Sequence, residues 1–374
     1  MKKFVLYGAG WQAEKFLYQF REKESIAYCI DGIRTGVFKQ FPIYTLDSAP
    51  DIHNYQIIVT AVWENYIQIR ECLEEKQLHE FQDFIWSEAF GKKLVLINAN
   101  CHGEFYKRYL YQSKTFKQEY VIWNLPPFHI HKSSQIPDKL LSRCDLFIHQ
   151  DVRPENPFGY KFSDEYIIPR LKPGCRTITV PNMVGMGRWN FPTMGMSNEK
   201  EYRYGRRAMF WRDSILDDAY HLYKKGQEIK TYIMSPDVFP QEKVRELFLK
   251  CMEKLQKRER NWDIKISDYI LAHYKAEKLF YDCDHAADCV MQEIGKRLCR
   301  KLGIEDVDGK LEYFMNWEES FIFPYVKQAL ELSWDEKYIR EEGNGEDYVI
   351  SGGKMDLDEY IREYIWWFYG ERIE

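Results

Sequence analysis

The sequence predicts an α/β protein in which a small N-terminal parallel sheet precedes a second α/β domain with a largely helical C-terminal part. Short apolar runs alternate with helical segments from residue 4 to residue 86, and this alternation restarts at Leu94. After Arg206 the apolar residues recur at helical spacing instead. Because strands that alternate with helices form parallel sheets, we expect two such sheets in this 374-residue chain. We divide the chain into residues 1–90, 91–333 and an acidic, aromatic tail, 334–374.

The composition is that of a globular protein. Hydrophobic residues make up 45% of the chain and charged residues 30%, which suits a packed core. The net charge of −5 argues against nucleic-acid binding. No apolar run reaches the length of a transmembrane segment, and the apolar start ends at Gly8 without a signal-peptide cleavage site. The nine cysteines form no small-domain disulfide framework, so we expect reduced thiols and a cytoplasmic protein.

The first predicted strand, Phe4 to Tyr7, runs into a glycine-rich turn. The turn reads Gly8-Ala-Gly-Trp-Gln-Ala13, the G-x-G-x-x-A pattern of Rossmann-like nucleotide-binding folds. Its glycines let backbone N–H groups approach a phosphate at a helix N-terminus. Asp31 ends the second strand 23 residues after Gly8, where such folds place an acid that binds a ribose. Gly8, Gly10 and Asp31 are therefore candidate nucleotide-binding residues.

The rest of residues 1–90 continues the alternation. We predict strands at Ala27 to Ile30, Gln56 to Ala61 and Phe84 to Trp86, and a helix at Tyr66 to Glu75. With Tyr7-Gly-Ala-Gly10 and Ile30-Asp31, the unit resembles the small N-terminal domains of sugar-modifying enzymes. That resemblance implies binding of a nucleotide or a nucleotide-sugar. The alternative is a tight turn without a ligand, because a single G-x-G-x-x-A match is a weak signal.

The second domain opens with a strand that leads to a cysteine. Leu94 to Ile97 is a continuous apolar run, as expected of a strand buried on both faces. Gly103 permits a sharp turn, and a helix is predicted at Glu104 to Gln112. Cys101 then lies beside the positive end of a helix, which favours the nucleophilic thiolate. The alternative is that Cys101 is a small buried hydrophobic residue.

Three more strands complete the second predicted sheet. They are expected at Glu119 to Trp123, Asp145 to His149 and Arg176 to Val180, with a helix at Ser163 to Leu171. His149 and Cys101 both follow buried strands, so their side chains are expected at the same edge of the sheet. The alternative for His149 is a capped loop histidine.

A second histidine, His285, stands just before a predicted helix. It follows Asp284 directly, and a neighbouring acid can orient an imidazole as a general base. Cys283 and Cys289 flank it, but no fourth ligand stands at the usual spacing and no C-x-x-C occurs. We therefore predict no metal site. His285 is the first choice of base and His149 the second.

The middle of the chain is basic, with fourteen Lys and Arg against eight Asp and Glu between Lys132 and Arg212. Such an excess suits a small phosphate-rich ligand, and the alternative is a solvated surface. Val180 to Pro192 lies in this segment, lacks a secondary-structure period, and is rich in Gly, Met, Pro and aromatic residues. A loop of this kind either lies over a ligand or covers the body without a site.

The C-terminal part is predicted to be helical. Helices are expected at Ala208 to Lys224, Gln241 to Lys257, Ser267 to Tyr274 and Ala286 to Leu302. The tail has twelve acids against five bases, and its last helix repeats apolar residues at Ile361, Tyr364, Ile365 and Phe368. We expect this helix to pack on the body, or to form the interface of a homo-oligomer.

Several short motifs occur together between residues 93 and 305. They are Asn98-Ala-Asn-Cys-His102, His149-Gln150, Val180-Pro-Asn-Met183, Phe191-Pro192, Lys278-Leu-Phe-Tyr281 and Asp284-His285. In these the chain resembles the WcbI family of polysaccharide-biosynthesis proteins. The family reads Gly-Asn-Cys-Gln at the first motif, where this chain has Ala99 and His102, and Asn-His-Pro at the last, where it has Asp284 and Ala286. The resemblance implies a coenzyme A-dependent acyltransferase, expected to acetylate a hydroxyl of a capsular or surface sugar.

The predicted site combines these residues with the resemblance. Cys101 attacks the acyl thioester or lies at the point of transfer, while the Asn100 amide and backbone N–H groups at Gly103 stabilise the oxyanion. Candidates for the coenzyme A phosphates are Arg170, Lys172, Arg176 and Arg188. The expected partners are an acyl donor such as acetyl-CoA and a sugar acceptor. Two alternatives remain open: a cysteine–histidine hydrolase, and a non-catalytic sugar-nucleotide-binding assembly protein.

Overall fold

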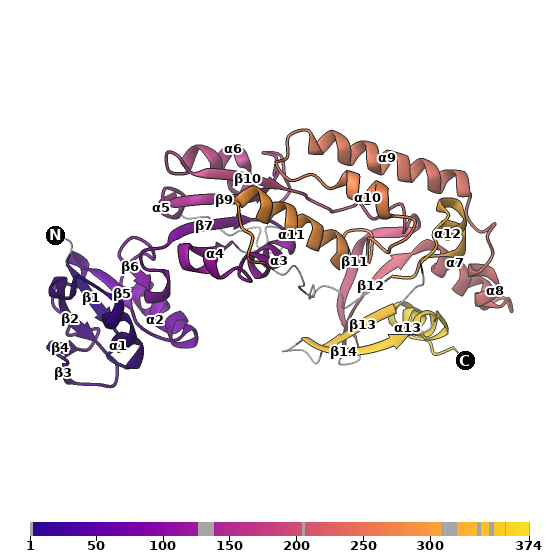
Figure 1. Cartoon of the computed structure of the whole chain (residues 1–374). Helices are drawn as coiled ribbons and strands as arrows, with labels where there is room; N and C mark the ends of the chain where they lie inside the picture. Colours follow the sequence, from indigo (N-terminus) through magenta and orange to yellow (C-terminus); the bar gives the residue numbers. More distant parts are fainter. Residues whose placement is uncertain are drawn as a thin grey trace.

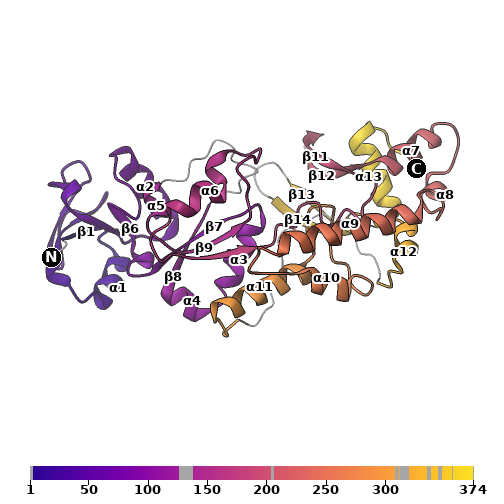
Figure 2. The same ribbon diagram turned by 90° about the horizontal axis from the view of Figure 1, so that it is seen from above.

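The computed structural model describes residues 3–125, 138–203, 206–307, 311, 320–334, 338–343, 348–355 and 357–373. Over these ranges the chain forms three sheets and the helices that cover and join them. Figure 1 shows the N-terminal sheet at one end of an elongated molecule, the second sheet in the middle, and the third sheet with most helices at the other end. Figure 2 shows the same order from above. The predicted α/β class, with two parallel sheets and a helical C-terminal part, is confirmed.

The N-terminal sheet has six strands in the order β3-β4-β2-β1-β5-β6. The elements are β1 Phe4–Tyr7, α1 Trp11–Gln19, β2 Ile26–Ile30, β3 Gly36–Phe38, β4 Phe41–Tyr44, β5 Gln56–Val59, α2 Trp63–Glu75 and β6 Phe84–Trp86. All neighbouring strands pair in parallel except β3 and β4, which form an antiparallel hairpin at the edge. The sequence did not predict this hairpin, because each strand is short and Pro42 of β4 is a residue that argues against a strand flanked on both sides.

The second sheet has four strands in the order β10-β9-β7-β8, all parallel. The elements are β7 Lys93–Asn98, α3 His102–Leu110, α4 Lys114–Glu119, β8 Tyr120–Asn124, α5 Asp138–Leu141, β9 Cys144–Gln150, α6 Asp164–Ile167 and β10 Arg176–Val180. Val95 and Ile97 face one hydrophobic cluster, and Leu94 and Leu96 face another. Because all four strands run the same way, their carboxyl ends share one edge, where parallel sheets hold ligands.

The third sheet corrects the prediction of a helix at Ala208 to Lys224. It is antiparallel, in the order β11-β12-β13-β14, with β11 Met194–Arg203, β12 Arg206–Asp213, β13 Tyr338–Gly343 and β14 Tyr348–Met355. The helix α7 starts only at Ser214 and ends at Tyr223. Asp213 fixes this start, because its Oδ1 accepts a hydrogen bond from Ile215 N at 2.9 Å.

The remaining helices lie mostly at the far end of the molecule (Figure 1). They are α8 Ile229–Ile233, α9 Gln241–Glu259, α10 Ser267–His273, α11 Asp288–Leu302, α12 Pro324–Leu330 and α13 Leu357–Tyr369. A side chain at Gly295 of α11 would lie 2.8 Å from the ring of Tyr109, so glycine lets α11 approach α3 closely. Tyr364 of α13 is buried, and its hydroxyl accepts a hydrogen bond from Asp213 N at 2.9 Å. The last helix thus packs on the body of its own chain.

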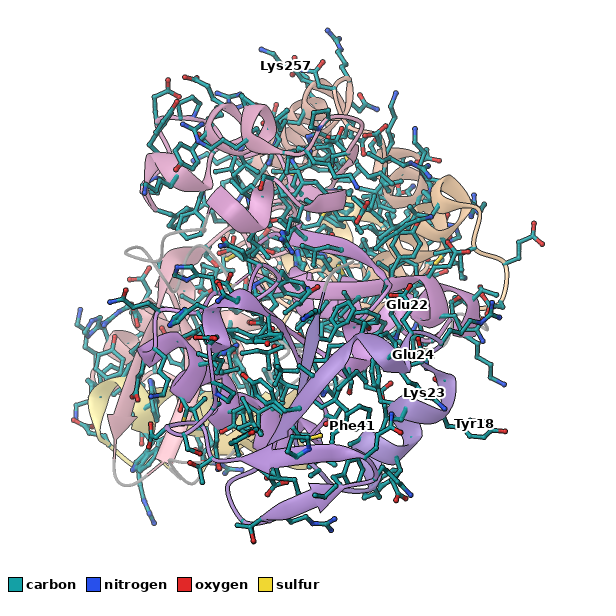
Figure 3. The ribbon with its side chains drawn as sticks, turned by 90° about the vertical axis from the view of Figure 1, so that its left-hand side faces the viewer. Tyr18, Glu22, Lys23, Glu24, Phe41 and Lys257 are labelled. Carbon is teal, nitrogen blue, oxygen red and sulfur yellow. The ribbon has the colours of Figure 1, made fainter. Side chains whose placement is uncertain are left out.

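The surface carries polar side chains and some exposed aromatic residues. Figure 3 shows Tyr18 of α1 and Lys257 of α9 pointing away from the body, and Tyr18 is 89% exposed. Within the described residues, none of the helices combines the length and the apolar character needed to cross a lipid bilayer.

Candidate active site

Cys101 lies in the turn between β7 and α3, at the carboxyl edge of the second sheet (Figure 1). β7 is buried from Leu94 to Asn98 and positions the turn rigidly. Cys101 is the residue immediately before α3. Its side chain is partly exposed, whereas its neighbours Asn100 and His102 are buried. Of these three side chains, the thiol is the one open to solvent.

A buried amide pair holds this turn in place. Asn100 Oδ1 accepts a hydrogen bond from His102 N at 3.0 Å, and Asn100 N donates to Gln150 Oε1 at 3.0 Å. Gln150 Nε2 donates to Asn100 Oδ1 at 3.2 Å and to Pro181 O at 3.0 Å. Because Gln150 ends β9 and Pro181 follows β10, one side chain ties together the ends of three strands.

His285 faces Cys101 from the turn before α11, and Asp282 orients it. Asp282 Oδ2 lies 2.6 Å from His285 Nδ1, and Asp282 Oδ1 accepts hydrogen bonds from the backbone N–H groups of Asp284 and His285, both at 2.7 Å. The Asp282 residue is only 2% exposed. Since Nδ1 is taken by the carboxylate, Nε2 is the ring nitrogen left to face the Cys101 side chain, which is close enough to raise the pKa of His285.

Asp282 and His285 each stabilise the charged form of the other. Burial alone would lower the pKa of His285, but the charge and hydrogen bond of Asp282, with a smaller effect of Cys101, raise that pKa well above its usual value. Burial likewise opposes the charge of Asp282, yet His285 and two backbone N–H groups hold the pKa of this carboxyl below its usual value. The arrangement therefore favours an imidazolium at His285 and a carboxylate at Asp282 near neutral pH.

The loop from Val180 to Pro192 is fastened to the His285 turn. Gly185 N donates to Asp284 Oδ1 at 2.7 Å, and Gly187 N donates to Cys283 O at 3.1 Å. A side chain at Gly187 would lie 2.3 Å from Asp282 O, so only glycine allows this approach. The acid predicted to orient His285 was Asp284. The structure corrects this, because Asp284 binds the loop and Asp282 binds the imidazole.

Cys101, His285 and Asp282 thus bring together a thiol, an imidazole and a carboxylate, the groups that covalent catalysis by a nucleophile, a base and an orienting acid requires. Gly103 was predicted to donate to an oxyanion, but its N–H donates to Asn100 O at 3.0 Å. In the described part of the chain, the backbone N–H of Cys101 and the amide nitrogen of Asn100 have no acceptor. These two groups, and not Gly103, are placed to receive developing negative charge beside the thiol.

Comparison with known proteins gives the family. The model of the family described as "Polysaccharide biosynthesis enzyme WcbI" matches residues 94–307, more than half of the chain. The chain belongs to the WcbI family. The matched region contains the second sheet, Cys101, Asp282 and His285. A search of curated proteins finds no match.

A solved structure of WcbI has a similar fold. It shares 18% sequence identity with this chain over 75% of this chain and 91% of its own, with a TM-score of 0.55. At this identity the likeness shows the fold. That structure is described as a native polysaccharide biosynthesis enzyme without a disulfide bond between coenzyme A and one of its cysteines.

His149 of this WcbI-family chain does not meet Cys101. Its Nδ1 lies 2.9 Å from Asp164 Oδ1, its Nε2 lies 3.3 Å from Thr179 Oγ1, and its ring stacks on Phe147. Side chains alternate between the faces of a strand, so Gln150 reaches the Cys101 turn and His149 faces the other side. The structure therefore does not support the prediction of His149 as an alternative base.

The four predicted phosphate ligands have different surroundings. Arg170 donates to Tyr166 O at 2.7 Å, Lys172 forms an ion pair with Asp145, and Arg176 donates to Lys301 O. Asp145 and Arg176 lie near the starts of β9 and β10, so Lys172 and Arg176 are at the edge of the sheet opposite Cys101. Arg188 is half-buried on the loop and has no ion pair within the described ranges. Burial, with the charge of Asp282, raises the pKa of Asp284, and the nearby charge of Arg188 offsets part of this rise. Arg188 is the member of the set that lies near His285.

The glycine-rich turn of the N-terminal sheet is stabilised by packing on Thr60 and by hydrogen bonds to Asp31. Gly8 has φ +106°, and a Cβ there would lie 2.6 Å from Thr60 O, so packing alone requires glycine. Asp31 Oδ2 accepts from Ala9 N at 2.8 Å, and Oδ1 accepts from Ile33 N and Arg34 N, both at 2.9 Å. Gly10 precedes α1 with open space around its Cα.

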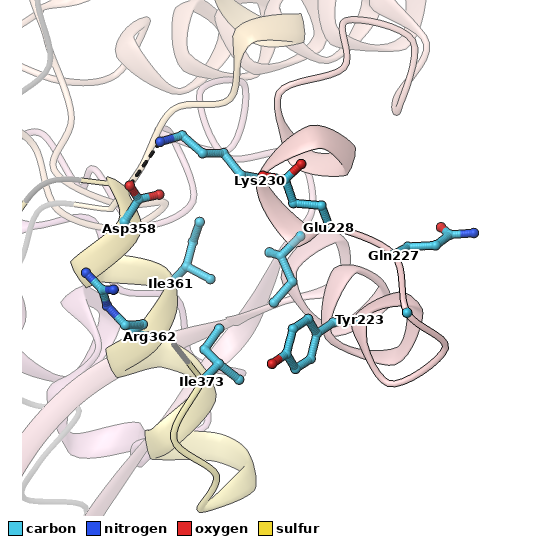
Figure 4. A pocket seen from close by; sticks show the side chains of 10 residues that line it. Tyr223, Gln227, Glu228, Lys230, Asp358, Ile361, Arg362 and Ile373 are labelled. Carbon is cyan, nitrogen blue, oxygen red and sulfur yellow. Dashed lines mark hydrogen bonds and ion pairs between the residues drawn. The ribbon is translucent and has the colours of Figure 1, made fainter.

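A cavity of about 560 Å³ lies away from this site, between the α7–α8 segment and α13 (Figure 4). It is lined by Tyr223, Lys230, Asp358, Ile361 and others, and Lys230 pairs with Asp358 at 2.9 Å.

Across the described ranges, no three His, Cys, Asp or Glu side chains lie close enough together to bind a metal ion.

Proposed function

We propose that this WcbI-family protein transfers an acyl group, such as acetyl, from coenzyme A to a hydroxyl of a sugar in polysaccharide biosynthesis. The observation that carries the proposal is His285, oriented by Asp282 at 2.6 Å, with the Cys101 side chain near enough to act on its pKa. A thiol beside an imidazole forms thioesters, and coenzyme A carries its acyl group as a thioester.

The first step uses the charged state of the pair. Cys101 Sγ, as the thiolate, attacks the acyl carbon, and the Cys101 N–H with the Asn100 amide binds the oxyanion. His285 then gives its Nε2 proton to the departing thiolate. The acyl group rests on Cys101 Sγ and His285 is neutral, so atoms and charge balance.

The second step reverses the proton transfer. Neutral His285 accepts the proton of the sugar hydroxyl while the hydroxyl oxygen attacks the acyl carbon on Cys101. The Cys101 thiolate leaves, the ester forms on the sugar, and the thiolate–imidazolium pair is restored. Asp282 keeps Nδ1 occupied throughout, so the proton moves at Nε2 in both steps.

Coenzyme A fits the charges that surround the site. The description of the WcbI structure above mentions coenzyme A. Because this chain has the same fold and belongs to the same family, we propose coenzyme A as its ligand as well. Arg188, half-buried beside the His285 turn without an ion pair in the described ranges, is a cation for an anionic group of either substrate.

The test is acyl transfer by the Cys101→Ala variant. With acetyl-CoA and a panel of sugar acceptors, the native chain should release thiol and form an ester, and Cys101→Ala should do neither while its unfolding curve is unchanged. Acetate without acylated sugar would indicate a hydrolase instead. Full transfer by Cys101→Ala would show that Cys101 is not the nucleophile.

For residues 1–90 we propose a separate nucleotide or nucleotide-sugar site at the Gly10 turn. The open space at Gly10 and the absence of a side-chain cap on α1 support it. Asp31 would contribute by shaping this turn, since its carboxylate oxygens already accept three backbone N–H groups.

A further inference from the structure

Arg258 stacks on Trp262 where α9 ends, and the charge of Arg153, from the segment after β9, acts on this pair. The guanidinium carbon of Arg258, in the last turn of α9, is 5.0 Å from the ring centroid of Trp262. Trp262 is 3% exposed, and its indole Nε1 has no hydrogen-bond partner in the described part of the chain. Arg153, three residues beyond β9, is exposed and close enough for its charge to act on Arg258.

The charge of Arg258 is poorly compensated. Burial lowers the pKa of Arg258, Asp151 offsets part of this effect, and Arg153 adds to it. Asp151 forms no ion pair with Arg258, and Arg258 has no hydrogen-bond acceptor within the described ranges. A guanidinium does not lose its proton near neutral pH, so a charged group stays partly desolvated without a close partner. This costs free energy that an anion at the same place would recover.

The cluster lies at the same edge of the sheet as Cys101. Asp151 follows Gln150, whose side chain accepts the hydrogen bond from Asn100 N. Asp263, which follows Trp262, accepts a hydrogen bond from Thr179 N of β10 at 3.0 Å. Arg258, Arg153 and Trp262 therefore stand over the β9–β10 side of this edge, and the Cys101 turn stands over β7.

We propose that Arg258, Arg153 and the indole N–H of Trp262 bind a phosphate ester of a substrate. All three groups donate and none accepts, which suits an oxyanion with several lone pairs. The planar guanidinium matches two phosphate oxygens, and the stacked indole limits its orientation. A neutral sugar or a cation would leave the donors unpaired.

The proposal rests on the proposed function in one respect, the identity of the substrates. The phosphate belongs either to coenzyme A, through its 3′-phosphate or pyrophosphate, or to a phosphorylated sugar acceptor. Both present the same chemistry to the cluster, and binding measurements separate them.

The experiment is calorimetry on the full chain with four probes: coenzyme A, pantetheine, a hexose 1-phosphate and the free hexose. Arg258→Met and Arg153→Met are the test variants. Lys257→Met and Arg260→Met are the controls, because both side chains are exposed and Figure 3 shows Lys257 pointing away from the body. Losing a charge-assisted hydrogen bond weakens binding about ten- to a hundredfold. We expect that loss in the test variants for one phosphorylated probe, with pantetheine, free hexose and the controls unaffected.

The outcomes separate the two proposals. A loss confined to coenzyme A assigns the site to the acyl donor, and a loss confined to hexose 1-phosphate assigns it to the acceptor. If the native chain binds hexose 1-phosphate through Arg258 but does not bind coenzyme A, the phosphate site stands and the proposed function falls. If both test variants bind both phosphorylated probes as tightly as the native chain, or the native chain binds neither, the phosphate site is overturned. Arg153 is exposed, so Arg153→Met keeps the test valid even where Arg258→Met fails to fold.

Discussion

Asp282 decides the orientation and the charge of His285, and its replacement should show this. Asp282→Asn keeps the shape of the side chain but removes the charge that faces Nδ1. An imidazole in the wrong tautomer cannot exchange its Nε2 proton, so kcat for acyl transfer should fall about 10²- to 10⁴-fold. The KM for the acyl donor should stay near the native value, because Asp282 is buried and out of reach of substrate. Steady-state kinetics measure both quantities.

The pH dependence gives an independent readout of the same residue. Because the pKa of native His285 is raised, its imidazolium persists above the usual pKa of about 6.5. Deprotonation removes the His285 proton that the departing thiolate needs, so we expect the alkaline limb of kcat/KM above neutral pH in the native protein. In Asp282→Asn this limb should move to lower pH. Asp164→Asn is the matched control, since Asp164 holds His149 on the other face, and it should leave the limb in place. A limb that moves in Asp164→Asn alone would make His149 the base.

The sequence identified which cysteine and histidine to consider, but it did not identify the side chains that bind them. Cys101 and His285 stand next to recognisable strand and helix boundaries, so both could be selected without a structure. Asp282 was missed because Asp284 is adjacent to His285, although the turn brings the acid three residues away onto Nδ1. Gln150 was passed over for His149, because the face of a strand that a side chain occupies depends on where pairing begins. The spacing Asp-x-x-His before a helix was the available signal.

Among the elements, the loop from Val180 to Pro192 sets the position of Asp282. A Cβ at Gly187 would lie 2.3 Å from Asp282 O and 2.9 Å from Phe280 Cδ1, and Phe280 is fully buried. Gly187→Ala should therefore shift the backbone that carries the acid. We expect the free energy of unfolding to fall by about 1–3 kcal/mol, with a loss of acyl transfer at temperatures where the variant is folded. Chemical denaturation and an activity assay measure these effects.

Gly32→Ala is the control for this substitution. Its added methyl group meets nothing within 4 Å, so stability and transfer should both stay close to native values. A Gly187→Ala protein that is as stable and as active as the native chain would show that the loop does not position Asp282.

Elements with a strong period were predicted well, and those formed by long-range pairing were not. β1, β6 and β10 match their predicted bounds, because apolar runs between turn residues mark buried strands. β12 was assigned to a helix, since the pairing partners of an antiparallel strand are not visible in its own sequence. The cap at Asp213 was the local signal that the helix starts later.

At the scale of the whole molecule, a second site on the N-terminal sheet predicts binding that is independent of Cys101. Calorimetry of the full chain with nucleotide-sugars should give heat that Cys101→Ala does not change. Gly10→Val should abolish it while the melting temperature is kept, because a Cβ at Gly10 meets no protein atom within 4 Å and the added side chain covers the turn. Gly8→Val should instead unfold the turn against Thr60. If the native chain gives no heat, residues 1–90 form a purely structural domain.

The domain boundaries, the cytoplasmic location and a homo-oligomer stay predictions.

The most direct test of the account is whether the acyl group passes through Cys101. The full chain is incubated with acetyl-CoA without a sugar, quenched in acid and analysed by peptide mass spectrometry. We predict one acetyl group on the peptide that contains Cys101, none in Cys101→Ala, and loss of the label when a competent sugar acceptor is added. An active protein that never carries the label, or carries it on another cysteine, would contradict covalent transfer through Cys101.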